Sequence, residues 1–200
     1  MVEPPTAQRL VVGITGASGS VYGIRMLELL GAMDSIESHL ILSKAGALTL
    51  REETDRHPDE VRELADVVHS PGDIGASIAS GSFRVHGMVV APCSIKTLSS
   101  IATSFSDTLI SRAADVTLKE GRPLILMVRE TPFHLGHLRM MVAASEAGAI
   151  IAPPIPAFYN RPGSLAEAVD HSCRRVLDRL GLAGEAPSWQ GVGRDDLDAP

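Results

Sequence analysis

The sequence predicts an α/β fold in which a mainly parallel sheet carries helices on both faces, in three layers. Short apolar segments alternate with amphipathic segments along most of the chain, and a glycine or proline often follows an apolar segment. Parallel strands need crossover connections, which are usually helices, so this alternation favours a parallel sheet. With 200 residues, 44% of them hydrophobic, the chain is long enough for one such domain with a sizeable core.

The first strand is expected at Leu10–Ile14, because this segment is short, apolar and followed by a glycine-rich turn. A helix from about Ser20 to Met33 follows, since Val21, Ile24 and Leu27 recur at helical spacing. These two elements form the first half of a strand–helix–strand unit.

The next strand is expected at His39–Ser43, and the segment Lys44–Glu53 directly after it is expected to begin the next helix. The segment Thr54–Phe83 is polar and interrupted by prolines and glycines, so one short helix at Asp59–Val67 and looser structure are expected there. A third strand, Gly87–Ala91, ends before a proline.

The remaining elements continue the alternation. They are helices at Ser94–Thr103 and Asp107–Lys119, a strand at Pro123–Val128, a helix at Leu135–Ala147, a short strand at Ala149–Ala152 and a helix at Ser164–Leu180. We therefore expect a single domain over residues 1–183. Residues 184–200 form a tail rich in Gly, Asp and Pro, expected to be loose apart from Trp189.

A turn with regularly spaced glycines joins the first strand to the first helix. Gly13, Gly16 and Gly19 give the spacing G-x-x-G-x-x-G, which lets backbone N–H groups and a helix N-terminus approach a phosphate. Dinucleotide-binding folds use G-x-G-x-x-G instead, so the spacing indicates a phosphate carried by a ligand other than NAD. Ser18 adds a hydroxyl that can cap the helix or contact that ligand.

Polar groups follow the other strands as well. Because the carboxyl ends of parallel strands share one edge of the sheet, these groups are expected to meet. They are Thr15–Ser18, Ser43 with Lys44, Pro92–Thr97, and Arg129 with Glu130. Hydroxyls, backbone donors and a guanidinium suit an oxyanion ligand with polar ring edges.

Composition excludes several classes of protein. A net charge of −6 argues against a nucleic-acid surface. Two cysteines are too few for a disulfide framework and are not placed as zinc ligands. We see no signal peptide and no apolar run long enough to span a membrane, so a soluble cytoplasmic protein is expected.

Five segments carry a more specific resemblance: GITGASGSVYG, LILSKAGALTLREET, VVAPCSIKTLSSIAT, LISRAADVTLKEGRPLILMVRETPFHLGHL and GAIIAPPIPAFYNRP. From about Arg9 to Leu180 the chain resembles the flavin prenyltransferases, the UbiX family, long described as 3-octaprenyl-4-hydroxybenzoate or phenylacrylic acid decarboxylases. The resemblance implies a Rossmann-like flavoprotein fold and a dodecamer built from trimers, with active sites at subunit interfaces. It also implies a metal-independent reaction that joins dimethylallyl monophosphate to reduced FMN and supplies prenylated FMN to a UbiD-type decarboxylase.

The resemblance also implies roles for particular residues. FMN would contact Gly16, Ala17, Ser18, Ser43, Ser94, Ile95, Lys96, Thr97 and Arg129. The prenyl phosphate would be held by Lys119, Arg129, Tyr159 and Arg175, with Arg112 nearby, and some of these would come from a neighbouring subunit. Ser18, Glu53, Lys119 and Glu130 would be catalytic, with Glu130 and Ser18, or the released phosphate, as candidates for the base that removes a proton during ring closure.

Two departures from the family pattern concern one loop. Ser104 stands where the family usually has Gly, and Thr108 where it usually has Asn. The Thr108 change permits a first alternative, a non-catalytic FMN-binding accessory subunit of a decarboxylase system. The second alternative is an FMN-dependent cysteine decarboxylase on the same scaffold, which the chain resembles mainly in the strand-to-turn regions. The catalytic His of the cysteine decarboxylases has no counterpart in the first helix, SVYGIRMLELLGAM.

Overall fold

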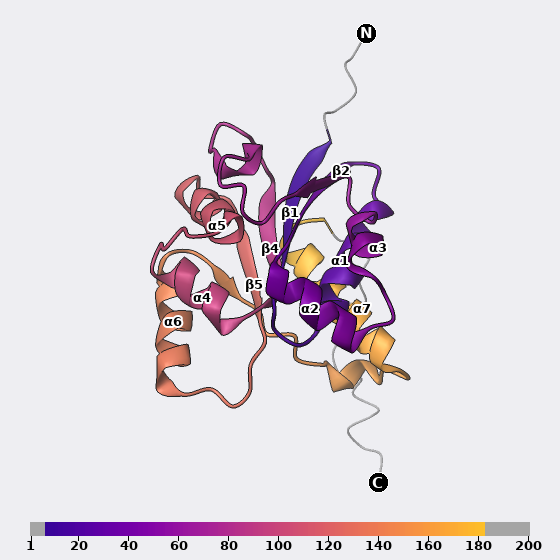
Figure 1. Ribbon diagram of the computed structural model, residues 1–200. Coiled ribbons are helices and arrows are strands. Elements are labelled where there is room, and N and C mark those ends of the chain that lie inside the picture. The colour runs from indigo at the N-terminus through magenta and orange to yellow at the C-terminus, as the bar shows by residue number, and fades with distance from the viewer. Residues whose placement is uncertain (1–6, 183–200) are drawn as a thin grey trace.

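The computed structural model describes residues 7–182, and it confirms the α/β class. Six parallel strands form one sheet in the order β3-β2-β1-β4-β5-β6 (Figure 1). The strands are β1 (Gln8–Ile14), β2 (Ile36–Leu42), β3 (Val67–His69), β4 (Gly87–Cys93), β5 (Leu124–Val128) and β6 (Ile150–Ile151). This is the strand order of doubly wound nucleotide-binding sheets.

Helices cover both faces of the sheet. One face carries α1 (Ser20–Gly31), α2 (Lys44–Glu53), α3 (Pro58–Arg62) and α7 (Leu165–Arg179). The other carries α4 (Ile95–Ala102), α5 (Leu109–Lys119), α6 (Leu135–Glu146) and a 3₁₀ turn at Ser77–Ala79. In Figure 1 the two groups lie to the right and left of the sheet.

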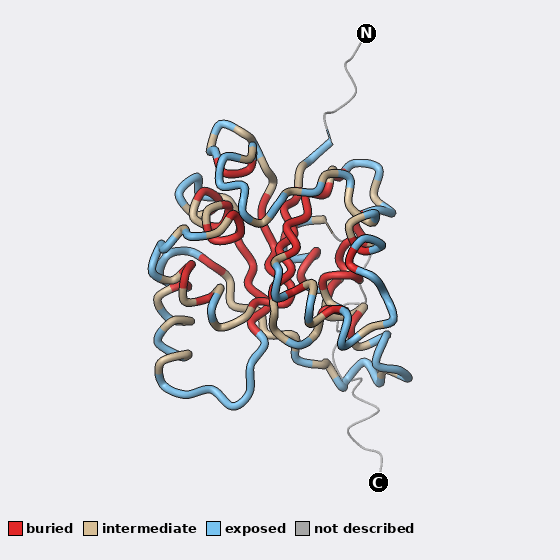
Figure 2. The backbone as a smooth tube through the Cα atoms, in the orientation of Figure 1, coloured by how far each residue is buried: buried red, intermediate tan, exposed pale blue. Residues whose placement is uncertain are grey.

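Alternation along the strands divides the hydrophobic core in two. In β1, Leu10, Val12 and Ile14 pack on the α1 and α7 side, whereas Val11 packs on the α4 and α5 side. Successive side chains of a strand point to opposite faces, so a strand covered on both faces is apolar throughout. Figure 2 shows the buried backbone concentrated in the sheet.

The chain reverses its direction of winding between β1 and β4. From β1 it builds outward through β2 and β3, and then returns to place β4, β5 and β6 on the other side of β1. Loops that leave two neighbouring strands in opposite directions leave a crevice at their carboxyl ends, which is where open α/β sheets bind ligands.

One strand was not predicted. Val67–His69 pairs with β2 as the edge strand β3, whereas the sequence favoured a helix up to Val67; the helix α3 ends at Arg62. Three residues are too short a run for a period of two to be recognised.

The other differences are smaller. The helices and strands end within a few residues of the predicted bounds, and the helix after β2 begins at Lys44, as predicted. A second 3₁₀ turn, Phe158–Asn160, was not predicted. The expected boundary at 183/184, the tail and Trp189 lie outside the described residues. Within residues 7–182, no helix has both the length and the apolar character that crossing a membrane requires.

Candidate functional site

A cavity of about 590 Å³ lies at the point where the winding reverses, between the carboxyl ends of β1 and β4. Two helices begin at this cavity, α2 after Ser43 and α4 after Ser94. Its lining includes Gly16, Ser43, Ser94, Lys96 and Thr97, all of which the sequence predicted as FMN contacts.

Serine caps hold the starts of both helices. The hydroxyl oxygen of Ser43 accepts the N–H of Gly46 at 2.9 Å, and that of Ser94 accepts the N–H of Thr97 at 3.3 Å. Each cap occupies one N–H, so other first-turn N–H groups have no partner within their helix. Two positive helix ends that open on one cavity favour an anion there.

Thr15 joins the ends of the two central strands. Its hydroxyl donates to the carbonyl of Pro92 at 2.6 Å and accepts the N–H of Ser94 at 2.9 Å. The next residue must be glycine, because a Cβ on Gly16 would lie 2.6 Å from the Cβ of Ala45. The start of α2 is therefore packed directly against the turn after β1.

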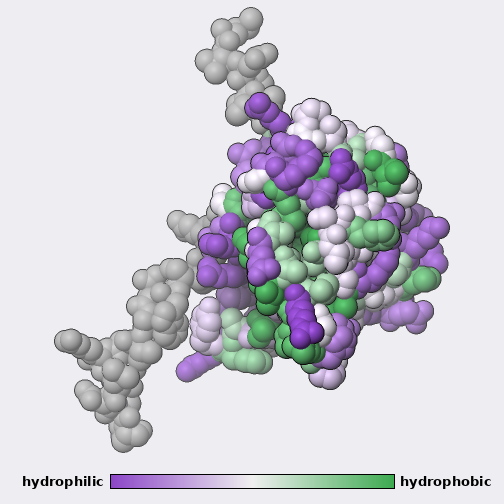
Figure 3. Space-filling view, turned by 90° about the vertical axis from the view of Figure 1, so that its left-hand side faces the viewer, coloured by the Kyte–Doolittle hydropathy of each residue, from purple (hydrophilic) through white to green (hydrophobic). Residues whose placement is uncertain are grey.

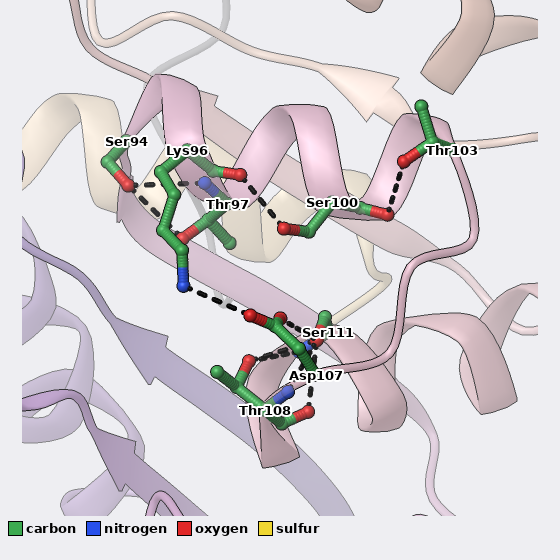
Figure 4. A network of polar contacts seen from close by, with 8 residues as sticks. All are labelled: Ser94, Lys96, Thr97, Ser100, Thr103, Asp107, Thr108 and Ser111. Carbon is green, nitrogen blue, oxygen red and sulfur yellow. Dashed lines mark hydrogen bonds and ion pairs between the residues drawn. The ribbon is translucent and has the colours of Figure 1, made fainter.

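A polar network closes the side of the cavity toward α5 (Figure 4). The ammonium of Lys96 lies 3.4 Å from a carboxylate oxygen of Asp107, and Asp107 accepts the hydroxyl of Ser111 at 3.3 Å. Thr108 caps α5 by accepting the N–H of Ser111, and Ser111 accepts the N–H of Thr108 in return. Threonine thus serves as the N-cap of α5, at a position where the resemblance leads us to expect Asn.

Ser104, the second departure from the expected pattern, affects the backbone conformation of its turn. Ser104 has a φ of 53°, in the left-handed region that glycine adopts without a steric penalty. A glycine is therefore the residue that this turn favours, and the serine adopts the same conformation with some strain.

The N-terminus of α1 is occupied by a carboxylate of the protein. Glu53, the last residue of α2, accepts the N–H of Gly19 at 2.9 and 3.1 Å and the N–H of Ser20 at 2.9 Å. The sequence suggested a phosphate at this helix start. The structure instead leaves the starts of α2 and α4 for an anion, because Glu53 satisfies the donors of α1.

The same contacts set the ionisation of Glu53. Burial acts to raise its pKa, but hydrogen bonds from the Ser18 hydroxyl and from the backbone of Ser20 and Gly19 outweigh it and hold the pKa below its ordinary value. Glu53 is therefore a carboxylate that orients Ser18 and closes the start of α1.

Tyr22 connects this corner to the loop after β6. Its hydroxyl donates to the carbonyl of Pro154 at 3.5 Å. Burial raises the pKa of Tyr22, the Cys173 thiol adds to the rise, and the guanidinium of Arg129 opposes it. Sequence reasoning missed Tyr22; its position three residues after Gly19 was the available signal.

Two predicted phosphate ligands share a second cavity. Tyr159 and Arg175 line a space of about 210 Å³ between α7 and the loop that follows β6. Tyr159 and the side chain of Arg175 are both largely exposed, and one N–H of the guanidinium donates to Asp178 at 2.9 Å.

Two other predicted phosphate ligands point elsewhere. Lys119 is the last residue of α5, about 15 Å along the helix from Leu109, and it pairs with Glu120 beside Gly81. It therefore lies toward the amino edge of the sheet. The guanidinium of Arg112 contacts the carbonyl of Ala79 at 3.2 Å and Asp115 at 3.0 Å. Within one chain, neither cation joins Tyr159 and Arg175.

The remaining predicted residues lie near the carboxyl edge of the sheet but do not line the 590 Å³ cavity. Glu130 and Arg129 are exposed directly after β5, and Glu130 accepts the N–H of Thr131 at 2.9 Å. Ile95 is half-buried against the core, and Ala17 is half-buried in the turn after β1. In the described part of the chain, no cluster of three or more His, Cys, Asp or Glu side chains could hold a metal ion.

Comparison with known proteins gives a consistent result. Residues 3–153 match the Flavoprotein family model. Flavin prenyltransferase UbiX of Escherichia coli K12 is 57% identical over 188 residues, which cover 92% of this chain and all of that protein.

Two solved structures share both sequence and fold with this chain. One is a dodecameric FMN-dependent UbiX-like decarboxylase from Escherichia coli O157:H7, with a TM-score of 0.89 and 46% identity over 92% of this chain and all of that one. The other is AnUbiX (PadA1) in complex with FMN and dimethylallyl pyrophosphate, with a TM-score of 0.87 and 47% identity over the same shares. With this fold, this site and these relatives, the chain belongs to the flavin prenyltransferase (UbiX) family of flavoproteins.

Proposed function

We propose that this protein transfers the dimethylallyl group of dimethylallyl monophosphate to reduced FMN and releases prenylated FMN. It is a flavoprotein and a prenyltransferase. The observation that carries the proposal is the cavity between β1 and β4, where the starts of α2 and α4 open beside the predicted FMN contacts.

The residues around this cavity fit FMN. The phosphate would be bound by the first-turn N–H groups of α2 and α4 and by the hydroxyls of Ser43, Ser94 and Thr97. Gly16, Ala17 and Ser18, together with Ile95, Lys96 and Arg129, would contact the rest of the molecule. When bound and reduced, FMN supplies the electron-rich ring that accepts the prenyl group.

The second cavity fits the phosphate of the prenyl donor. Phosphate is a poor leaving group, and cations and hydrogen bonds aimed at its oxygens stabilise the charge that develops as the bond breaks. Tyr159 and Arg175 line this cavity, and Arg129 lies at the same edge of the sheet. These three residues would hold the phosphate from within one chain.

Lys119 and Arg112 would complete the phosphate site of a neighbouring subunit. Both lie on α5 and face away from Tyr159 of their own chain, so a contribution between subunits agrees with their position. One surface that donates residues to a different surface makes a head-to-tail contact, and such a contact forms a ring when the rotation between subunits closes.

Further surface is available for assembly. Leu135, Leu138 and Val142 are exposed along α6, and hydrophobic side chains reach the surface on the side of the molecule that Figure 3 presents. The related Escherichia coli protein is dodecameric. We propose a trimer-based dodecamer, with a particle mass in solution about twelve times the 21.2 kDa of the chain.

Proton transfer would fall to Glu130 and Ser18, or to the departing phosphate. Glu53 accepts the Ser18 hydroxyl, which fixes that hydroxyl beside the carboxylate. Glu130 is an exposed carboxylate at the end of β5. A UbiD-type decarboxylase as recipient of the product and a location in the cytoplasm remain proposals that rest on the family.

A subunit-complementation experiment tests the composite site. Lys119→Ala and Tyr159→Phe are made in separate chains and co-expressed with different tags, and phosphate release from dimethylallyl monophosphate is followed with reduced FMN. Each variant alone should be slow. If Lys119 acts on the neighbouring site, mixed oligomers should recover about a quarter of the wild-type sites by random mixing. Mixed oligomers as slow as the two parents would show that the two residues act in the same chain.

A further inference from the structure

The second cavity contains a side chain for which the proposed function has no role. His171 lines the 210 Å³ space together with Tyr159 and Arg175. It lies on α7, four residues before Arg175, so the two side chains occupy the same face of the helix one turn apart.

The ring of His171 is held by its neighbours. It meets the ring of Tyr159 edge to face, with centroids 6.3 Å apart and planes at 90°. Aromatic pairs prefer this arrangement. Apolar parts of the cavity wall are formed by Met127, Pro154 and Ile155. A charged ligand would therefore bind at the polar side, which is formed by Tyr159, His171 and Arg175.

Other polar groups near this side are already engaged. The hydroxyl of Ser172 donates to the carbonyl of Ala168 at 2.8 Å. Arg174 donates to Asp170 at 2.7 Å, and Asp170 also binds Arg25 of α1, so Arg174 is directed toward α1. Glu167, one turn before His171, accepts the N–H of Gly163 at 2.7 Å. His171 is therefore the side chain best placed to add a donor beside Arg175.

We propose that His171 is a specificity-determining residue that donates a ring N–H to the phosphate of the prenyl donor, next to Arg175 and Tyr159. This inference rests on the proposed function. A histidine ring carries at least one N–H in either protonation state, so it can donate to a phosphate oxygen.

Steady-state kinetics with dimethylallyl monophosphate test the assignment. His171→Leu removes the ring and its N–H donors, and His171→Phe keeps an aromatic ring against Tyr159 without a donor. Both should raise KM about tenfold, as expected for a lost hydrogen bond to a charged group, with kcat within about twofold. Arg174→Gln is the matched control on the same helix and should leave KM unchanged. An unchanged KM in both His171 variants would overturn the proposal, as would a loss confined to kcat.

A direct binding measurement separates this inference from the proposed function. Inorganic phosphate is titrated into the intact oligomer by calorimetry, which requires no turnover. If no variant or wild-type protein prenylates FMN but phosphate binds about tenfold more weakly to His171→Phe, the proposed function fails and the anion site stands. Equal phosphate affinity in wild type and His171→Phe would refute the role of His171.

Discussion

Replacing Glu53 by Gln should destabilise the fold without removing FMN. The carboxylate accepts the N–H groups of Gly19 and Ser20 at 2.9–3.1 Å and the hydroxyl of Ser18. A carboxylate at an exposed helix N-terminus contributes up to about 1 kcal/mol, and each hydrogen bond to a charged group about 1.5–3 kcal/mol. Since Glu53 is exposed, we take the lower end, a loss of about 2 kcal/mol.

In a chain of 200 residues this loss corresponds to a Tm lower by about 4–8 °C. Thermal unfolding at fixed protein concentration measures it, with the exposed neighbour Glu52→Gln as control. The pKa of Glu53 is below its ordinary 4.5, so its contribution is present above that pH and lost as pH falls through the native value. The difference from wild type should therefore shrink in acid. Equal Tm values for Glu53→Gln and Glu52→Gln at pH 7 would refute this reasoning.

The same variant should retain FMN and lose prenylation, because the proposed FMN contacts lie on other residues; loss of bound FMN would contradict that separation. Ser104→Gly should raise the free energy of unfolding in urea by about 1 kcal/mol, since the left-handed φ of 53° suits glycine; a lower stability would show that Ser104 makes a compensating contact. Gly16→Ala should weaken FMN binding at least tenfold by pushing α2 away from the cavity, whereas Gly75→Ala, where a Cβ meets only ordinary contacts, should not; equal FMN affinities would contradict this. Burial lowers the pKa of His69, and a charge on His39, whose Nδ1 lies 2.9 Å from Nε2 of His69, lowers it further. The folded state therefore binds fewer protons than the unfolded chain, so the free energy of unfolding should fall as pH drops below about 6.5. His69→Asn should flatten that part of the stability–pH curve, and an unaltered curve would assign the acid sensitivity to another group.

Much of the fold could be predicted because apolar residues recur with a regular period along the longer helices and strands. The start of the helix at Lys44 was found, since it directly follows an apolar strand segment. The strand Val67–His69 could not be found, because an edge strand of three residues depends on its pairing with β2 rather than on its own pattern.

The candidate site could be predicted in part for a similar reason. Residues at strand ends, such as Ser43 and Ser94, follow from the topology of a parallel sheet. The contact of Glu53 with the start of α1 and the position of His171 beside Tyr159 depend on how separate helices pack. No local pattern in the sequence carries that information.

The most direct test of the proposed function is the mass of the flavin after reaction. The purified oligomer is incubated without oxygen with reduced FMN and dimethylallyl monophosphate, and the released flavin is analysed by mass spectrometry. Our proposal predicts a flavin heavier by one five-carbon prenyl unit, formed by wild type and lost in Lys119→Ala. FMN that is bound but recovered unmodified would contradict it and favour a flavin-carrying accessory subunit.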